Sequence, residues 1–172
     1  MGKIKTRTKG RGYCLFLMVC LTSLIIVSCS HNTVLDEGRE FYRNVWNRFT
    51  PEAFTVNIGN AENYYNIDVT VAVDTLHYRY REVPLAITLT SPDGEQRRFT
   101  TAVQLQDKGR WRGEMQDGYR VATARVRSYF SFNRKGEHRM EVGQLTSQYD
   151  LEGIHGIHVC IEKAKIDYSH LD

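Results

Sequence analysis

Between residues 66 and 73, apolar side chains alternate one by one with small or polar ones, and this pattern constrains the fold more than any other feature of the chain. The apolar set is Ile67, Val69, Val71 and Val73, and the other set is Asn66, Asp68, Thr70 and Ala72. Successive side chains of a β-strand point to opposite faces, so one set faces a core and the other faces water. The segment therefore predicts a half-buried strand.

The same period of two recurs along the rest of the chain. Alternating runs surround Leu85–Leu89, Phe99–Leu105 and Ile157–Ile161, and Val121–Phe132 is rich in Val, Tyr and Phe. Turn chemistry separates the runs, as in Ser91-Pro92-Asp93-Gly94 and Asn133-Arg134-Lys135-Gly136, the second of which leads into a run around Met140 and Val142. Roughly eight short strands without helical periodicity predict an all-β fold, an antiparallel β-sandwich with a jelly-roll-like arrangement.

An aromatic segment precedes these runs. Its members fall three or four residues apart, as on a helix, but Pro51 ends the spacing quickly: Phe41, Tyr42, Val45, Trp46 and Phe49. A short helix and a packed irregular segment both fit this pattern. Trp46 is expected to cover the core, because a Trp side chain buries a large area.

The N-terminus reads as a bacterial lipoprotein signal peptide. Five basic side chains come first, namely Lys3, Lys5, Arg7, Lys9 and Arg11. Residues 13–27 are apolar but too few to span a bilayer comfortably. Ile26-Val27-Ser28-Cys29 then has the form of a lipobox, in which a small residue precedes the cysteine. Cys14 and Cys20 follow the bulky Tyr13 and Val19, so neither suits this cleavage.

These features divide the chain into three parts. Residues 1–28 are expected to be the signal peptide, and Cys29 is expected to become the acylated first residue. Stable anchoring needs more than one acyl chain, which a lipoprotein supplies with palmitate and similar groups. Residues 29–40 are polar and predict a lipidated tether. Residues 41–172 are long enough to form one β-sandwich domain with a core.

Charge and cysteine content exclude two classes of protein. The chain has 23 basic and 20 acidic residues, but residues 1–28 hold five of the basic ones and none of the acidic ones. The remaining 18 basic and 20 acidic residues give a formal charge of −2, with no basic stripe for nucleic acid. Cys14 and Cys20 are expected to leave with the signal peptide and Cys29 to be acylated, so Cys160 has no cysteine to pair with and no disulfide framework is expected.

Three groups of residues are candidates for a catalytic or metal site. His155 and His158 lie three residues apart, so a regular strand places them on opposite faces, and only a bulge at Gly156 brings both to one ion. Asp107, Glu114 and Asp117 lack the spacing of a calcium loop. Cys160 has His158 nearby, but nothing orients the imidazole as a base. The sequence therefore predicts no enzyme, no metal and no cofactor.

Aromatic and basic residues offer a candidate surface for a partner. Tyr78 and Tyr80 are expected on one face of a strand, with Arg79 and Arg81 on the other. We expect Tyr78, Tyr80, Arg81 and the region of Trp111 to contact a partner protein. Aromatic stripes on a sandwich also stack sugars, so a carbohydrate-binding envelope lipoprotein is the alternative.

Four short segments after residue 90 occur in a specific order and spacing. They are Ser91-Pro92-Asp93-Gly94, Lys108-Gly109-Arg110-Trp111-Arg112-Gly113, Arg139-Met140-Glu141 and the segment from Leu151 to Lys163. Together with the preceding lipobox, they resemble the gliding-motility lipoprotein GldH family over about Trp46 to Lys163. The resemblance implies a small, non-enzymatic lipoprotein of the envelope machinery for surface gliding, with ties to the protein secretion system that exports its adhesins.

The same resemblance implies partners and a location. The expected partners are the membrane, through acyl chains on Cys29, and other envelope proteins of the gliding or secretion machinery. No acidic cluster directly follows Cys29, as it does in many surface-exported lipoproteins. We therefore expect the protein at the cell outer membrane, on its periplasmic side.

Overall fold

The computed structural model describes residues 32–165, which form β-strands joined by turns and one 3-10 turn, η1 (Tyr42–Asn44). The strands are β1 (Thr33–Glu40), β2 (Val45–Asn47), β3 (Glu52–Ile58), β4 (Tyr65–Val73), β5 (Glu82–Thr90), β6 (Gln96–Gln104), β7 (Gln106–Asp107), β8 (Arg110–Trp111), β9 (Glu114–Gln116), β10 (Tyr119–Phe130), β11 (Gly136–Gln144), β12 (Asp150–Glu152) and β13 (Ile154–Lys163). Among these residues, no helix has the length and apolar character needed to cross a bilayer.

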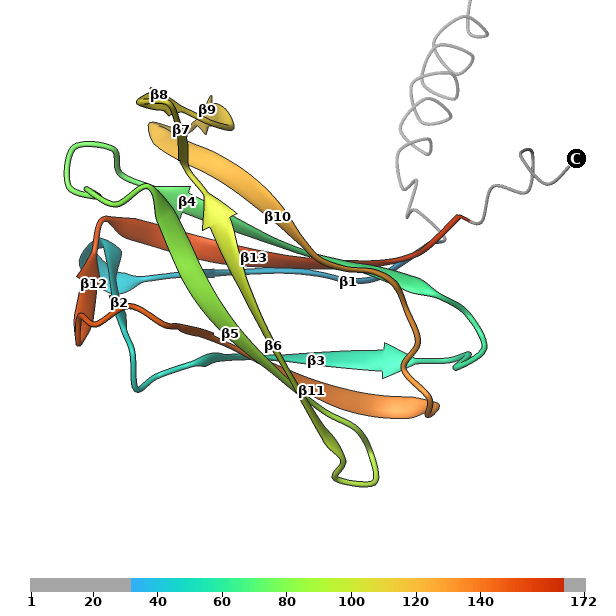
Figure 1. Cartoon of the computed structure of the whole chain (residues 1–172). Helices are drawn as coiled ribbons and strands as arrows, with labels where there is room; N and C mark the ends of the chain where they lie inside the picture. Colours follow the sequence, from blue (N-terminus) through green and yellow to red (C-terminus); the bar gives the residue numbers. More distant parts are fainter. Residues whose placement is uncertain (1–31, 166–172) are drawn as a thin grey trace, which may run out of the picture. The chain divides into compact units, whose positions relative to one another are not determined.

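Two antiparallel sheets pack face to face in this domain (Figure 1). One sheet has the order β1-β13-β4-β10, with the short β9 at its edge, and the other has the order β3-β11-β5-β6. When the eight long strands are numbered in chain order, the two orders become 1-8-3-6 and 2-7-4-5. This is the double Greek key of a jelly roll. The predicted antiparallel sandwich with jelly-roll arrangement is confirmed.

Three of the alternating runs become the central strands β4, β5 and β13, and the run from Phe99 contributes to the edge strand β6. In β4, every second side chain from Tyr65 to Val73 is buried, and β5 shows the same alternation from Val83 to Leu89. Ser91-Pro92-Asp93-Gly94 joins β5 to β6 as a hairpin, with Gly94 at φ 85°. The turn at residues 131–135 instead leads from one sheet to the other, from β10 to β11.

The expected tether is wrong for residues 33–40, because these residues form β1. This strand pairs with β13 from Thr33 opposite Glu162 to Glu40 opposite Gly156. Only Leu35 is fully buried, since β1 lies at the edge of its sheet and most of its other side chains face water. The described domain therefore starts before residue 41, and the rest of the expected tether lies outside the described residues.

The aromatic segment forms η1 and β2 and is not a longer helix. Trp46 is buried and stacks on Phe41, with ring centroids 4.9 Å apart and 17° between the planes. Its indole Nε1 donates a hydrogen bond of 3.4 Å to the carbonyl of Thr50. The expectation that Trp46 covers the core is confirmed.

Arginine side chains close both open sides of the sandwich. On one side, Arg39 of β1 donates to the carbonyl of Ala53 at 3.4 Å and lies over the ring of Phe54. On the other side, Arg127 of β10 lies over Phe99 of β6, 4.4 Å from the ring centroid. These guanidinium groups cover apolar edges of the core while remaining in contact with water.

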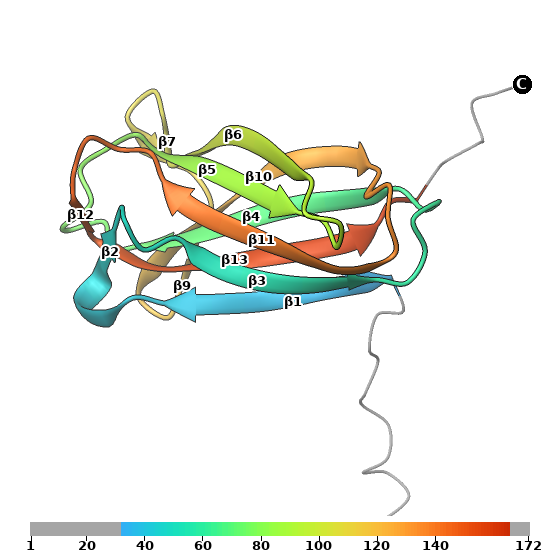
Figure 2. The same cartoon turned by 90° about the horizontal axis from the view of Figure 1, so that it is seen from below.

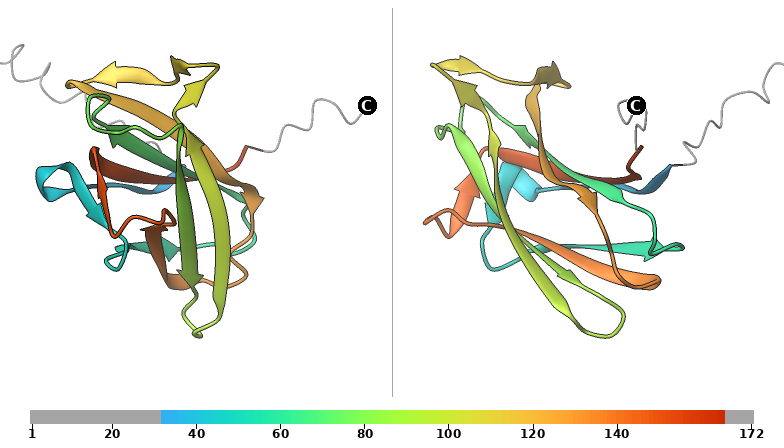
Figure 3. Two further views of the ribbon diagram at one scale, coloured as in Figure 1. Left: turned by 60° about the vertical axis from the view of Figure 1, so that its left-hand side comes forward. Right: turned by 45° about the vertical axis from the view of Figure 1, so that its right-hand side comes forward.

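The strand directions give the sandwich two distinct ends. β1 begins and β13 finishes at one end, which we call the base, and their arrows point in opposite directions in Figure 2. The opposite end, which we call the apex, carries the short strands, and Figure 3 shows the β7 to β9 excursion there. Its segments are residues 40–52, 73–82, 104–119 and 144–154. Strands of 8 to 10 residues place the apex about 30 Å from the base.

Candidate functional site

The segment Tyr78–Arg81 is a loop at the apex and not the predicted strand. Tyr78 is 2% exposed and belongs to the core, so its predicted contact with a partner is wrong. Tyr80 is 46% exposed, and Arg81 is exposed as well. The two tyrosines point to different environments because a loop has no period of two.

A network of hydrogen bonds holds Tyr78 in place. Its hydroxyl donates to the carbonyl of Glu82 at 2.7 Å, and its N–H donates to the carbonyl of Asp74 at 2.8 Å. Burial, followed by the nearby Tyr80 and Glu82, raises the pKa of the Tyr78 hydroxyl above its ordinary value of 10.0. Gly153 packs so closely against Tyr78 that a Cβ on the glycine would lie 2.6 Å from the tyrosine nitrogen.

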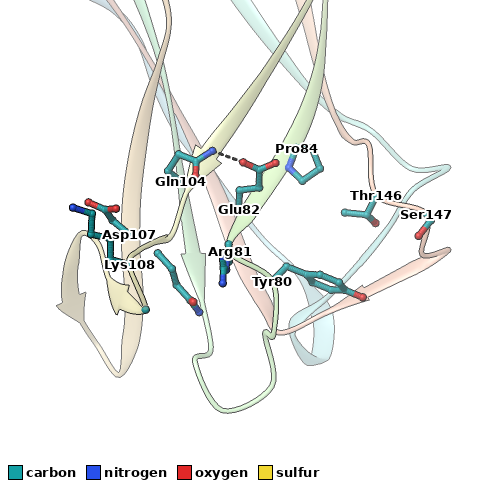
Figure 4. A pocket seen from close by; sticks show the side chains of 11 residues that line it. Tyr80, Arg81, Glu82, Pro84, Gln104, Asp107, Lys108, Thr146 and Ser147 are labelled. Atoms are coloured by element: carbon teal, nitrogen blue, oxygen red, sulfur yellow. Dashed lines mark hydrogen bonds between the residues drawn. The ribbon is translucent and has the colours of Figure 1, made fainter.

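Tyr80 lies beside a pocket of about 600 Å³ at the apex (Figure 4). Its ring meets the ring of Tyr78 edge-on, with centroids 5.5 Å apart and 68° between the planes. Three segments of the chain line the pocket: residues 80–84, 104–109 and 146–147. We call this cavity the Tyr80 pocket.

Charged side chains of both signs surround the Tyr80 pocket. Arg81 and Lys108 are cationic, and Glu82 and Asp107 are anionic. Gln104 donates a hydrogen bond from its amide to the carboxylate of Glu82 (Figure 4). The formal charges of the lining balance, so the pocket offers hydrogen-bond donors and acceptors without a strong net field.

Trp111 lies in the hairpin that borders the Tyr80 pocket but is not part of its lining. It pairs with Gln106 across the β7–β8 ladder, and its ring is partly buried against the core. Of the predicted contact residues, the structure brings together Tyr80 and Arg81. The buried ring of Tyr78 packs edge-on against the ring of Tyr80. Trp111 stabilises the neighbouring β7–β8 hairpin.

A second group of exposed apical residues is not predicted by the sequence pattern. Phe49 and Tyr149 are exposed and lie together, with ring centroids 5.6 Å apart, and Arg48 lies 5.7 Å above the Phe49 ring. Nearby in the chain, Arg43 lies 5.1 Å above the exposed ring of Tyr42. We call these five residues, which flank β2 and β12, the aromatic corner.

Exposed apolar side chains concentrate at the apex. Of the nine large exposed ones in the described residues, seven are apical: Tyr42, Phe49, Leu76, Tyr80, Met115, Leu145 and Tyr149. Only Tyr64 and Tyr129 lie toward the base. Such gathering of apolar surface at one end is typical of a binding region, whereas single scattered residues carry no such meaning.

Comparison with known protein families decides the relationship of this chain. The family model of the GldH lipoprotein matches residues 33–161. The chain belongs to the GldH lipoprotein family. A comparison with curated proteins gives no match. The GldH family match starts at the first residue of β1 and ends within β13, so it spans all eight long strands of the jelly roll.

Membership in the GldH family makes this a gliding-motility-associated lipoprotein of a family that is not known for enzymes. The predicted acylation site, Cys29, lies outside the described residues, as does the signal peptide at 1–28. The geometry of the described residues therefore bears on the domain of this GldH-family protein and not on its anchor.

The two histidines of β13 share one face, in contrast to the expectation for a regular strand. A register shift between Ile154 and Gly156 inserts a bulge, after which alternation resumes. His155 and His158 thus both line a concavity of about 880 Å³ on the outer face of the five-stranded sheet.

Each imidazole already has a partner in the protein. His155 Nδ1 lies 3.0 Å from Asn44 Oδ1, and its ring stacks on Tyr119 with centroids 3.8 Å apart. His158 Nε2 lies 2.9 Å from a carboxylate oxygen of Asp36. Within residues 32–165, no group of three His, Cys, Asp or Glu side chains is placed to hold a metal ion.

The surroundings of Cys160 disfavour a nucleophilic role. Burial raises the pKa of its thiol, and the neighbouring carboxylates of Asp36, Glu162 and Asp68 raise it further. The reactive form of cysteine is the thiolate, which these surroundings suppress. The expectation that nothing orients the imidazole of His158 is wrong, because its Nε2 lies 2.9 Å from Asp36. Within residues 32–165, no hydrogen bond joins this imidazole to the sulfur of Cys160.

The three carboxylates considered for calcium, Asp107, Glu114 and Asp117, lie on separate apical elements. Asp107 belongs to β7, Glu114 to β9, and Asp117 to the turn before β10, where its φ is 48°. Asp107 lines the Tyr80 pocket, and the other two do not. These positions fit turn and hairpin residues.

Proposed function

We propose that this GldH-family protein is a non-enzymatic, lipid-anchored interaction subunit of the gliding motility machinery and its associated protein secretion apparatus. The observation that carries the proposal is the aromatic corner in a member of this family. Aromatic and arginine side chains dominate the energetics of protein interfaces, because they combine large contact area with hydrogen bonding.

The proposed anchor is the acylated Cys29 in the periplasmic leaflet of the outer membrane. Cys29 precedes β1 by four residues, which span at most about 14 Å when fully extended. An anchor at this position keeps the base close to the bilayer. The apex, about 30 Å from the base, is then free to meet proteins beyond the lipid surface.

Anchoring changes the affinity that the apex needs. A lipid-anchored protein and an envelope partner share a thin layer, so their effective concentration is far above that of freely diffusing molecules. A modest interface centred on Phe49 and Tyr149 then suffices for a specific contact. The proposed partners are other envelope proteins of the gliding or secretion machinery.

Site-specific crosslinking in native envelopes tests the proposed surface. A photo-crosslinking amino acid at Tyr149 in the aromatic corner is expected to capture discrete envelope proteins. The same amino acid at Tyr129, a comparably exposed tyrosine toward the base, is the matched control. The proposal is wrong if both positions give the same products or if Tyr149 gives none.

The anchor is tested separately with Cys29→Ala. This variant is expected to accumulate as an unprocessed precursor without acyl chains, which intact-protein mass spectrometry distinguishes from the mature lipoprotein. A mature mass with acyl chains still present in the Cys29→Ala protein would refute acylation at this residue.

A further inference from the structure

We propose that the Tyr80 pocket is a binding site for a neutral saccharide. The pocket shares no lining residue with the aromatic corner, so this inference stands independently of the proposed protein contact. It rests on the shape of the cavity, the position of one aromatic ring and the balance of charges around it.

The cavity has the size and the rigidity of a ligand site. Its volume of about 600 Å³ lies within the range of small-molecule sites and accommodates one or two sugar rings. Backbone hydrogen bonds connect its walls: the N–H groups of Leu105 and Gln106 both donate to the carbonyl of Arg81, at 2.8 and 3.0 Å. The N–H of Leu145 donates to the carbonyl of Pro84 at 2.9 Å. The three lining segments are therefore held together before any ligand arrives.

Tyr80 supplies the apolar platform that a sugar ring requires. One face of a pyranose presents C–H groups, which pack on the face of an aromatic ring, while its hydroxyl groups point outward. Tyr80 is 46% exposed and is supported at its edge by the buried Tyr78, whose own hydroxyl is hydrogen-bonded. This support orients the ring without covering it.

The remaining lining offers hydrogen bonds of both kinds. Within residues 32–165, the side chains of Arg81, Asp107 and Lys108 make no hydrogen bond or ion pair with another residue. Their donors and acceptors are available for hydroxyl groups, which both donate and accept. Ser147 adds a further hydroxyl at the opposite wall (Figure 4).

Charge selects against the main competing ligands. Two cationic and two anionic side chains balance in the lining, so a phosphate or sulfate meets Glu82 and Asp107 as repulsive neighbours. An apolar peptide side chain would cover Arg81, Asp107 and Lys108 without offering a hydrogen-bond partner to any of the three. A neutral polyhydroxylated ligand avoids both costs.

The test uses the full-length lipoprotein purified in detergent and an array of neutral, sulfated and sialylated glycans. We expect retention of neutral glycans, followed by calorimetry with the best neutral oligosaccharide. Tyr80→Ala should weaken binding at least tenfold, Tyr80→Phe should retain it, and Asp107→Asn should weaken it several-fold. Tyr64→Ala is the matched control, since Tyr64 is 45% exposed and lies at the base.

Two kinds of result would overturn the inference. One is that no neutral glycan on the array is retained, or that only charged glycans are. The other is that Tyr64→Ala weakens binding as much as Tyr80→Ala, which would locate the glycan elsewhere. Equal thermal denaturation midpoints of the variants exclude unfolding as the cause of any loss. Crosslinking from Tyr149 is unaffected by these outcomes, so the two proposals fail separately.

Discussion

Replacing Gly153 with alanine should destabilise the apex more than a left-handed backbone alone explains. Gly153 has φ 82°, and a Cβ there would lie 2.6 Å from the nitrogen and 2.9 Å from the Cβ of Tyr78. Gly153 also bridges two segments, because its carbonyl accepts from Asp74 N–H and its N–H donates to the Asn44 carbonyl, each at 2.8 Å. The backbone around Tyr78 must therefore shift when a methyl group is added.

The magnitude follows from two separate costs. An L-residue in the left-handed region costs roughly 1–2 kcal/mol. Forcing extra atoms into a packed site costs roughly another 1–3 kcal/mol. Gly153→Ala should thus lower the free energy of unfolding by about 2–5 kcal/mol, or the melting temperature by about 6–25 °C for a domain of this size.

Gly94→Ala is the matched control. Gly94 has φ 85°, but no atom of the described residues, apart from the glycine and its chain neighbours, lies within 4 Å of the position that its Cβ would occupy. Gly94→Ala should therefore lower the free energy of unfolding only by the cost of placing alanine in the left-handed region. Thermal denaturation followed by far-UV circular dichroism should give a midpoint for Gly153→Ala well below that of Gly94→Ala. Equal midpoints would show that the packing of Gly153 on Tyr78 does not contribute, and the reasoning would be refuted.

Three further predictions concern single side chains. His138→Met should raise the free energy of unfolding by about 1 kcal/mol in chemical denaturation, because the buried Nε2 of His138 has no hydrogen-bond partner within residues 32–165. We expect this gain to exceed the loss of the 3.2 Å contact between Nδ1 and the Gly136 carbonyl. Ser91→Ala should raise the pKa of Asp93 in a carboxyl NMR titration, since the Ser91 hydroxyl and then Arg134 hold that pKa at about 2, below its ordinary 3.8. The stabilisation from Asp93 is therefore complete above about pH 4 and is lost as the pH falls through about 2. Cys160 should react with iodoacetamide more slowly than a free cysteine at pH 8, because its thiol pKa is raised.

Strands that bury one face could be predicted from the sequence. β4 and β5 alternate because each lies between two neighbouring strands and packs one face on the opposite sheet. β1 could not be predicted in the same way. It is an edge strand with one fully buried side chain, and its partner β13 lies more than a hundred residues further along the chain. The polar composition of residues 29–40 therefore predicts a tether, although residues 33–40 form a strand.

The residues of the apical site could be predicted from the sequence only in part. The spacing of Tyr78 and Tyr80 resembles a strand face, but the turn at Asp74 and the close approach of Gly153 direct Tyr78 inward. Phe49 and Tyr149 are a hundred positions apart and meet only because β2 pairs with β12. No local pattern predicts such a meeting, although two exposed aromatic residues beside turn-forming sequence are a usable signal.

The position of β13 between β1 and β4 restricts when the domain can fold. Synthesis from the N-terminus delivers β1 first and β13 last, yet β1 has no other strand partner in the sheet that the structure describes. The first sheet therefore stays incomplete until about residue 163 has emerged, and long-range pairing of this kind is slow. Truncation before residue 154 should yield an unpaired, aggregation-prone polypeptide and not a smaller domain.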